Sequence, residues 1–85
     1  VGPYKLDRLY LPKVFWRNAL FVKCSLIKAV FDQSHMDNAQ FIQSSLEKAS
    51  FSEIQLDKVI FRQTSVLSIN FTGASLVGAN FLDAE

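Results

Sequence analysis

The strongest constraint in this sequence is a large apolar residue at every fifth position. From residue 21 onward, phenylalanine stands at every tenth position, and leucine, methionine or valine stands halfway between. These centres are Phe21, Leu26, Phe31, Met36, Phe41, Leu46, Phe51, Leu56, Phe61, Val66, Phe71, Leu76 and Phe81. A second, usually smaller residue lies two positions before each centre, as Ala19 does before Phe21. The repeat therefore limits which folds are open to the chain.

A five-residue period fits neither regular secondary structure. In an α-helix five residues turn by about 500°, so successive centres would lie ~140° apart and form no stripe. In a flat strand an odd spacing places successive centres on opposite faces. The pattern instead predicts a square coil of about twenty residues, with one centre pointing inward from each side. Such coils would stack at the inter-strand spacing of ~4.8 Å.

The alternation of large and medium centres supports this square cross-section. Centres one coil apart form four inward columns, and the two phenylalanine-rich columns face each other across the axis. The columns are Phe21, Phe41, Phe61 and Phe81; Leu11, Phe31, Phe51 and Phe71; Leu6, Leu26, Leu46 and Val66; and Trp16, Met36, Leu56 and Leu76. Every coil then has nearly the same core volume, as close packing requires.

With units such as Ala79-Asn80-Phe81-Leu82-Asp83, the chain resembles the pentapeptide repeat family. The family unit is Ala, Asp or Asn, Leu or Phe, then two variable residues. The resemblance implies an all-β fold, a right-handed quadrilateral β-helix of about four coils. The handedness follows from the resemblance and not from the spacing.

The two ends of the chain depart from the repeat. Residues 1–18 are expected to form an N-terminal cap and an irregular first coil, because Tyr4 and Leu9 are large for the small site and Pro3 lacks an N–H. Residues 19–85 are expected to form the β-helix. The chain stops soon after Ala84 begins another unit, which predicts a fragment or module of a longer protein that continues beyond residue 85. An end-to-end homodimer is the alternative that the resemblance offers.

No catalytic constellation is expected, and neither a cofactor nor a metal. The lone Cys24 falls on an inward site and the lone His35 on an outward site of another side, so they form no nucleophile–base pair. His35, Asp37 and Asp57 are a weak set of metal ligands, and a polar surface is the favoured interpretation. A lone buried thiol favours a reducing, cytoplasmic compartment. Asn70-Phe71-Thr72 is a glycosylation triplet whose use the sequence leaves open.

Composition also limits the partners. The net charge of +1 is unlike that of a nucleic-acid binder, so nucleic acid is not an expected partner. No apolar run approaches the ~20 residues that span a bilayer, so no membrane partner is expected. Basic residues are concentrated in residues 1–28 and acidic residues in 29–85, which gives the rod an electrostatic polarity. Arg8, Lys28 and Lys48 would stack in one column, as a phosphate contact or as a solvated surface.

One side of the predicted coil carries a set of apolar residues that point outward. The candidate partner-binding residues flank the Phe21–Phe81 column and are Leu20, Val22, Ile42, Ile60 and Leu82. They form a contact patch, or they are the scattered surface apolar residues that most proteins have.

The predicted function is a non-enzymatic structural or protein-interaction module. Its rigid β-helical surface would contact a protein partner or a neighbouring domain. The resemblance offers two alternatives: a DNA-mimicking topoisomerase inhibitor of the quinolone-resistance type, and a targeting domain of a larger effector. The first fits poorly, because those inhibitors are long acidic dimers and this chain is slightly basic.

Overall fold

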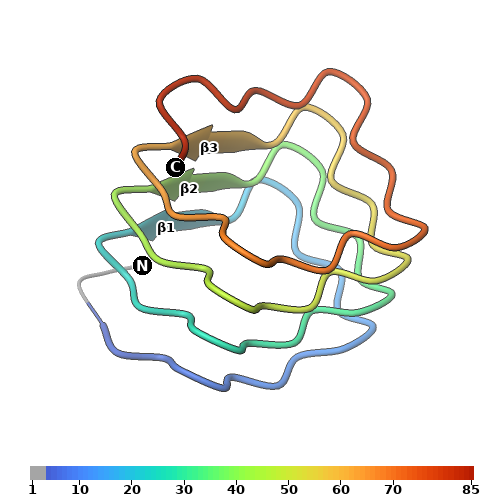
Figure 1. Ribbon diagram of the computed structural model, residues 1–85. Coiled ribbons are helices and arrows are strands. Elements are labelled where there is room, and N and C mark those ends of the chain that lie inside the picture. The colour runs from blue at the N-terminus through green and yellow to red at the C-terminus, as the bar shows by residue number, and fades with distance from the viewer. Residues whose placement is uncertain (1–3) are drawn as a thin grey trace.

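The structure, a computed structural model, describes residues 4–85. The chain winds as a right-handed quadrilateral β-helix, so the predicted fold class is confirmed (Figure 1). Three short strands stack in parallel on one side of the helix: β1 (Leu20–Val22), β2 (Gln40–Ile42) and β3 (Ile60–Arg62). They form one sheet in the order β1-β2-β3.

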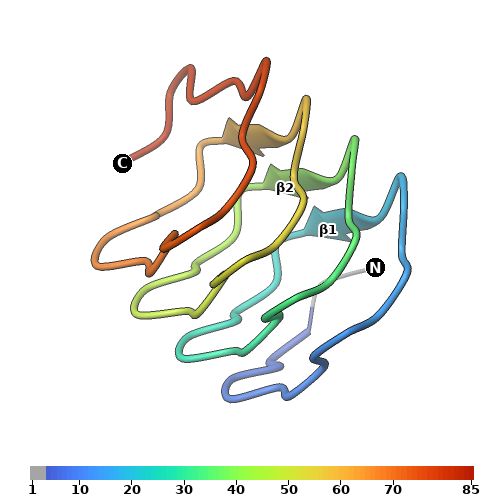
Figure 2. The same cartoon turned by 90° about the vertical axis from the view of Figure 1, so that its right-hand side faces the viewer.

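Neighbouring coils are in register at a spacing of twenty residues. Phe21, Phe41 and Phe61 are paired at the centres of the three strands, and isolated bridges repeat the pairing on the other sides. Backbone hydrogen bonds run along the axis, as from the Leu26 N–H to the Ser45 carbonyl at 2.8 Å. Figure 2 shows the coils as a stack of similar loops. Each coil therefore contacts only its neighbours.

The inward centres fill the interior in columns. The rings of Phe21 and Phe41 lie 5.0 Å apart, those of Phe41 and Phe61 5.5 Å, and those of Phe61 and Phe81 5.0 Å. The centres with less than 2% exposure are Phe21, Phe31, Phe41, Phe51, Phe61, Leu26, Met36, Leu46 and Leu56. Val66, Phe71 and Leu76 are only partly buried, and Phe81 is 42% exposed. Burial therefore decreases along one column although the residue type stays the same.

The first coil keeps the backbone geometry of the later coils. Bridges join Lys5 to Ser25, Tyr10 to Val30 and Phe15 to His35 at the same spacing. The irregularity expected for residues 1–18 is thus absent from the backbone of residues 5–18. It lies in the side chains, because Tyr4, Tyr10 and Phe15 project into solvent. Pro3 lies outside the described residues, and the role of this segment as a cap stays a prediction.

The corners of the coil use left-handed backbone conformations. The residue two positions after a centre has a φ between 51° and 71°, and fourteen of these residues, such as Asn38 and Lys48, are not glycine. At most corners the turn is closed by a hydrogen bond from residue i+3 to residue i, as from Ala49 N–H to Leu46 O at 3.0 Å. A positive φ at the third residue is the feature of a type II turn. Gly73 and Gly78 also occupy such corners.

Buried hydroxyls build the corner that follows β1, β2 and β3. The Cys24 N–H donates to Ser44 Oγ at 3.1 Å, and the Ser44 N–H donates to Thr64 Oγ1 at 3.3 Å. Thr64 Oγ1 in turn donates to the Phe41 carbonyl at 2.8 Å. Each hydroxyl thus satisfies backbone groups of the preceding coil that would be costly to bury unpaired. These bonds fix the edge of the sheet on which the candidate partner-binding residues lie.

Candidate functional site

Four of the five candidate partner-binding residues lie on the outer surface of the three-stranded sheet, and Leu82 lies beside it in the coil that follows β3. We call this surface the β1–β3 face and define it by Leu20, Val22, Gln40, Ile42, Ile60, Arg62, Asn80 and Leu82. Leu20 is 44% exposed and Leu82 71%, whereas Val22, Ile42 and Ile60 are half-buried. The two leucines therefore stand at the ends of the face and the three β-branched residues lie between them.

Each column of the face is interrupted by polar residues. Leu20, Gln40, Ile60 and Asn80 form one column, and Val22, Ile42 and Arg62 pair in the other, which Leu82 continues. The sequence analysis named the apolar members alone and missed Arg62 and Asn80. Their signal was present, since Arg62 stands twenty residues after Ile42 and Asn80 twenty after Ile60. The surface is amphipathic and not a continuous apolar patch.

A small hollow lies at the β3 end of the face. Its volume is about 230 Å³, and Ile60, Arg62, Asn80 and Leu82 line it. Asn80 Oδ1 accepts a hydrogen bond from the Leu82 N–H at 2.8 Å, which holds the amide in one orientation. The volume is below the ~300 Å³ at which small-molecule sites begin. The hollow therefore has the size for one side chain of a partner and not for a cofactor.

The β1–β3 face differs from the other three sides in charge. None of its eight residues is acidic, and its one charged residue is Arg62. Equivalent outward positions on the other sides carry carboxylates, among them Glu47, Asp32 and Asp37. Lys23, Lys58 and Asp83 occupy corners beside the face, so three cations and one anion give the face and its corners a net charge of +2.

Carboxylates on the other sides are engaged within the scaffold. Three aspartates each accept one hydrogen bond from a serine hydroxyl and one from a backbone N–H of the next coil. Asp7 accepts from Ser25 and Ile27, Asp32 from Ser50 and Ser52, and Asp57 from Ser75 and Val77. The hydroxyl of Ser25, followed by the N–H of Ile27, holds the pKa of Asp7 below its usual value, because both hydrogen bonds favour the ionised form. These side chains join consecutive coils.

His35, Asp37 and Asp57, the weak set of metal ligands, make contacts with other residues instead of converging on one point. Asp37 Oδ2 lies 3.7 Å from Arg17 Nε, and Asp37 Oδ1 accepts the Asp57 N–H at 3.3 Å. The His35 ring stacks on Phe15 with centroids 4.5 Å apart. Among residues 4–85 no three His, Cys, Asp or Glu side chains are placed to hold a metal ion.

The single thiol packs inside the coil. Cys24 is buried, and its Sγ lies 3.6 Å from the Val22 carbonyl. His35 belongs to another side of the coil, so the two groups come from different columns. As expected, Cys24 occupies an inward small site, where it packs as a small apolar residue.

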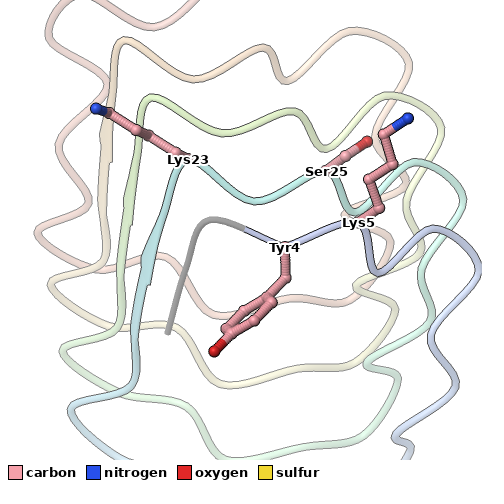
Figure 3. Close-up of a pocket in the computed structure, with 4 residues that line it drawn as sticks. All are labelled: Tyr4, Lys5, Lys23 and Ser25. Atoms are coloured by element: carbon pink, nitrogen blue, oxygen red, sulfur yellow. The ribbon is translucent and has the colours of Figure 1, made fainter.

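A second hollow, of about 330 Å³, lies beside the first coil (Figure 3). Tyr4, Lys5, Lys23 and Ser25 line it. Figure 3 shows the two lysine side chains extending in different directions and the Tyr4 ring turned away from both ammonium groups. The Ser25 hydroxyl is already bonded to Asp7. The donors do not converge, so this hollow lacks the geometry of an anion site.

Solved structures share this architecture. HetL, a pentapeptide repeat protein involved in heterocyst differentiation regulation from the cyanobacterium Nostoc sp. strain PCC 7120, matches with a TM-score of 0.54 at 18% identity, covering 94% of this chain and 48% of that one. QnrB1, a plasmid-mediated fluoroquinolone resistance protein, matches with a TM-score of 0.50 at 14% identity, covering 92% and 55%. Rfr23, a pentapeptide repeat protein from the cyanobacterium Cyanothece 51142, has a TM-score of 0.37 at 10% identity, covering 95% and 84%.

The likenesses to HetL and QnrB1 concern the fold alone, and this chain spans about half the length of each of them. No curated protein sequence matches the chain. Within residues 4–85 no helix is long and apolar enough to cross a bilayer. Residues 14–85 match the sequence profile described as the pentapeptide repeat region. Together with the square coil and its stacked phenylalanines, this match shows that the chain belongs to the pentapeptide repeat family.

Proposed function

We propose that this chain is a non-enzymatic interaction module that binds a protein partner, or a neighbouring domain, through the β1–β3 face. The observation that carries the proposal is the position of Leu20, Val22, Ile42 and Ile60 on the outside of one hydrogen-bonded sheet, with Leu82 exposed in the next coil. Apolar side chains interspersed with polar ones on a rigid exposed surface are typical of protein contacts. Half-buried residues between exposed ones give such a surface little rotamer entropy to lose on binding.

The rigidity of the coil supports a binding role. The face is backed by the stacked rings of Phe21, Phe41 and Phe61, and its edge is held by the hydroxyls of Ser44 and Thr64. A preorganised surface loses little conformational freedom when it binds. The polar residues Gln40, Arg62 and Asn80 between the apolar ones provide hydrogen-bonding groups, as interface rims do.

A photo-crosslinking experiment tests this proposal. A benzophenone side chain is placed at Ile42 in the protein expressed in its source cells, and a matched probe is placed at Ile27. Ile27 is also half-buried and directly follows an inward centre, but it lies on another side. We expect one discrete crosslinked protein from position 42 that Leu20→Asp abolishes, and none from position 27. Equal crosslinking from both positions, or no discrete product from position 42, would show that the face is not the binding surface.

The DNA-mimic alternative has little support in this chain. QnrB1 shares the fold at 14% identity, and this likeness carries no partner across. The chain has a net charge of +1 with most of its basic residues in the first coils, unlike a phosphate backbone. A targeting role in a larger effector is compatible with the same face and would be seen as a contact with a neighbouring domain in the crosslinking experiment.

A further inference from the structure

The β1–β3 face has a feature that narrows the chemistry of its partner. We infer that the face binds a peptide segment with acidic and apolar residues, one carboxylate of which enters the hollow beside Arg62. This inference rests on the proposed function, since it assumes that the face binds protein. It adds the class of partner and the side chain that determines specificity.

Arg62 is the centre of the inference. Its side chain is exposed, lines the hollow and makes no ion pair with any carboxylate of residues 4–85. By contrast, Arg17 on another side is already 3.7 Å from Asp37. A guanidinium presents a planar fork of donors that fits a carboxylate with two parallel hydrogen bonds. Arg62 is therefore the cation on this face that is available to an external acid.

The walls of the hollow also favour a carboxylate ligand. Asn80 Oδ1 is occupied by the Leu82 N–H, so the amide offers its NH₂ group, a donor, to a ligand. Ile60 and Leu82 form the apolar part of the lining. Apolar walls exclude water when a ligand is seated, and an ion pair is stronger where water is excluded. A volume of about 230 Å³ admits one Asp or Glu side chain.

The rest of the side carries the same sign of charge. The eight residues of the face lack a carboxylate, and the corners contribute Lys23 and Lys58 against Asp83. An acidic segment is therefore attracted to this side, and the face itself has no carboxylate that would repel it. Ile42 and Val22 continue the apolar contact from the hollow toward β1. A segment that lies along the axis can thus place its acid at Arg62 and its apolar residues on β2 and β1.

The composition of the face favours a peptide over a nucleic acid. A nucleic acid needs several phosphate contacts, because each neutralised phosphate contributes only part of the affinity. The face itself offers one cation, Arg62, among five apolar residues and two amides. That proportion resembles the apolar core and polar rim of a protein interface.

The test is a selection from a phage-displayed library of random twelve-residue peptides on the immobilised 85-residue protein. We expect enrichment of peptides in which Asp or Glu is adjacent to Leu, Ile or Phe. Their affinity should fall about tenfold or more with Arg62→Gln and also with Ile42→Asp. Arg62→Lys, which keeps the charge and loses the fork, should restore only part of the affinity. The matched controls Lys48→Gln and Ile27→Asp lie on another side and should leave binding unchanged, and thermal unfolding verifies the fold of each variant.

The possible outcomes separate the two proposals. Peptides without acidic enrichment that depend on Ile42 but not on Arg62 would overturn the inference and leave the interaction face standing. Peptides that tolerate both Ile42→Asp and Arg62→Gln bind elsewhere and would overturn both proposals, as would the absence of selected peptides. A Glu→Gln change in the best peptide that weakens binding to the wild type, but not to the Arg62→Gln variant, would assign the carboxylate to Arg62.

Discussion

The central coils and the last coil have the same pattern of residues but differ in burial. Phe61 and Phe81 belong to one column with rings 5.0 Å apart, yet Phe61 has no exposure and Phe81 is 42% exposed. Phe61 lies between the coils that contain Phe41 and Phe81, whereas Phe81 has a described neighbour on one side only. In a stack of this kind the contribution of a residue to stability depends on its place along the axis as well as on its type.

The same contrast is seen at the corners. Ser44 and Thr64 supply hydroxyls to the preceding coil, and the equivalent residue of the last coil is Ala84. The Ala84 N–H closes an ordinary turn with the Phe81 carbonyl at 2.9 Å. A corner of the central coils therefore makes hydrogen bonds with a hydroxyl of the next coil, whereas the corner of the last coil is closed by the hydrogen bond within its own turn.

The largest difference is expected for truncation of the two phenylalanines. Phe41→Ala should lower the free energy of unfolding by ~3–5 kcal/mol, because it leaves a cavity enclosed by coils on both sides. Phe81→Ala in the same 85-residue protein should cost roughly half of that or less, because much of the ring is already exposed. Urea unfolding of both variants measures the two values. Equal losses of unfolding free energy would mean that the place of a phenylalanine in the stack does not control its contribution to stability.

A smaller effect is expected at the buried hydroxyls. Thr64→Val keeps the shape of the side chain but leaves the Ser44 N–H and the Phe41 carbonyl without this partner, which should cost about 1–3 kcal/mol. Thr64→Ser keeps the hydroxyl and serves as the control for lost hydrogen bonding. Ala84→Ser, at the same corner of the last coil, should change stability by about 0.5 kcal/mol or less. The idea fails if Thr64→Val is as stable as Thr64→Ser in urea unfolding.

The smallest effect is expected at the exposed Asp7. Its pKa is lower in the folded chain than in the unfolded chain, because the Ser25 hydroxyl and the Ile27 N–H bind the carboxylate. Its stabilising effect is therefore fully present above the unfolded pKa of ~4 and is lost as the pH falls through the folded pKa. The difference in Tm between wild type and Asp7→Asn should shrink when the pH is lowered from neutral to ~3. Asp83→Asn is the control. A difference in Tm between wild type and Asp7→Asn that does not depend on pH would contradict the stabilising role of the Asp7 carboxylate.

The repeat made the architecture predictable to an unusual degree. The columns of Phe21, Phe31, Leu26 and Met36 followed from spacing alone, because each side of the coil has one inward centre and the coils pair in register. The same rule placed Cys24 inside and His35 outside. It also placed Leu20 and Ile42 on one side of the coil, although their binding role stays a prediction.

Other features could not be read from the period. Lys48 and Lys28 adopt a positive φ although neither is glycine, since the neighbouring coils hold the corner in a conformation that costs such residues about 1 kcal/mol or more. The regular backbone of residues 5–18 depends on pairing with the second coil, for example between Lys5 and Ser25. The large residues of this segment suggested an irregular coil, because residue size does not reveal such pairing.

The spacing of residues along the chain was enough to establish which side chains point inward, which share a column, and that the coil has four sides. A repeating spacing specifies direction and register in a chain that turns at fixed intervals. The three-dimensional arrangement was needed to show that Ser44 and Thr64 donate hydrogen bonds to the preceding coil and that Asp7 accepts one from Ser25. It was also needed to show that Arg62 borders a hollow and has no acidic partner among residues 4–85. These pairings depend on side-chain directions and distances between residues a whole coil apart, which no local pattern contains.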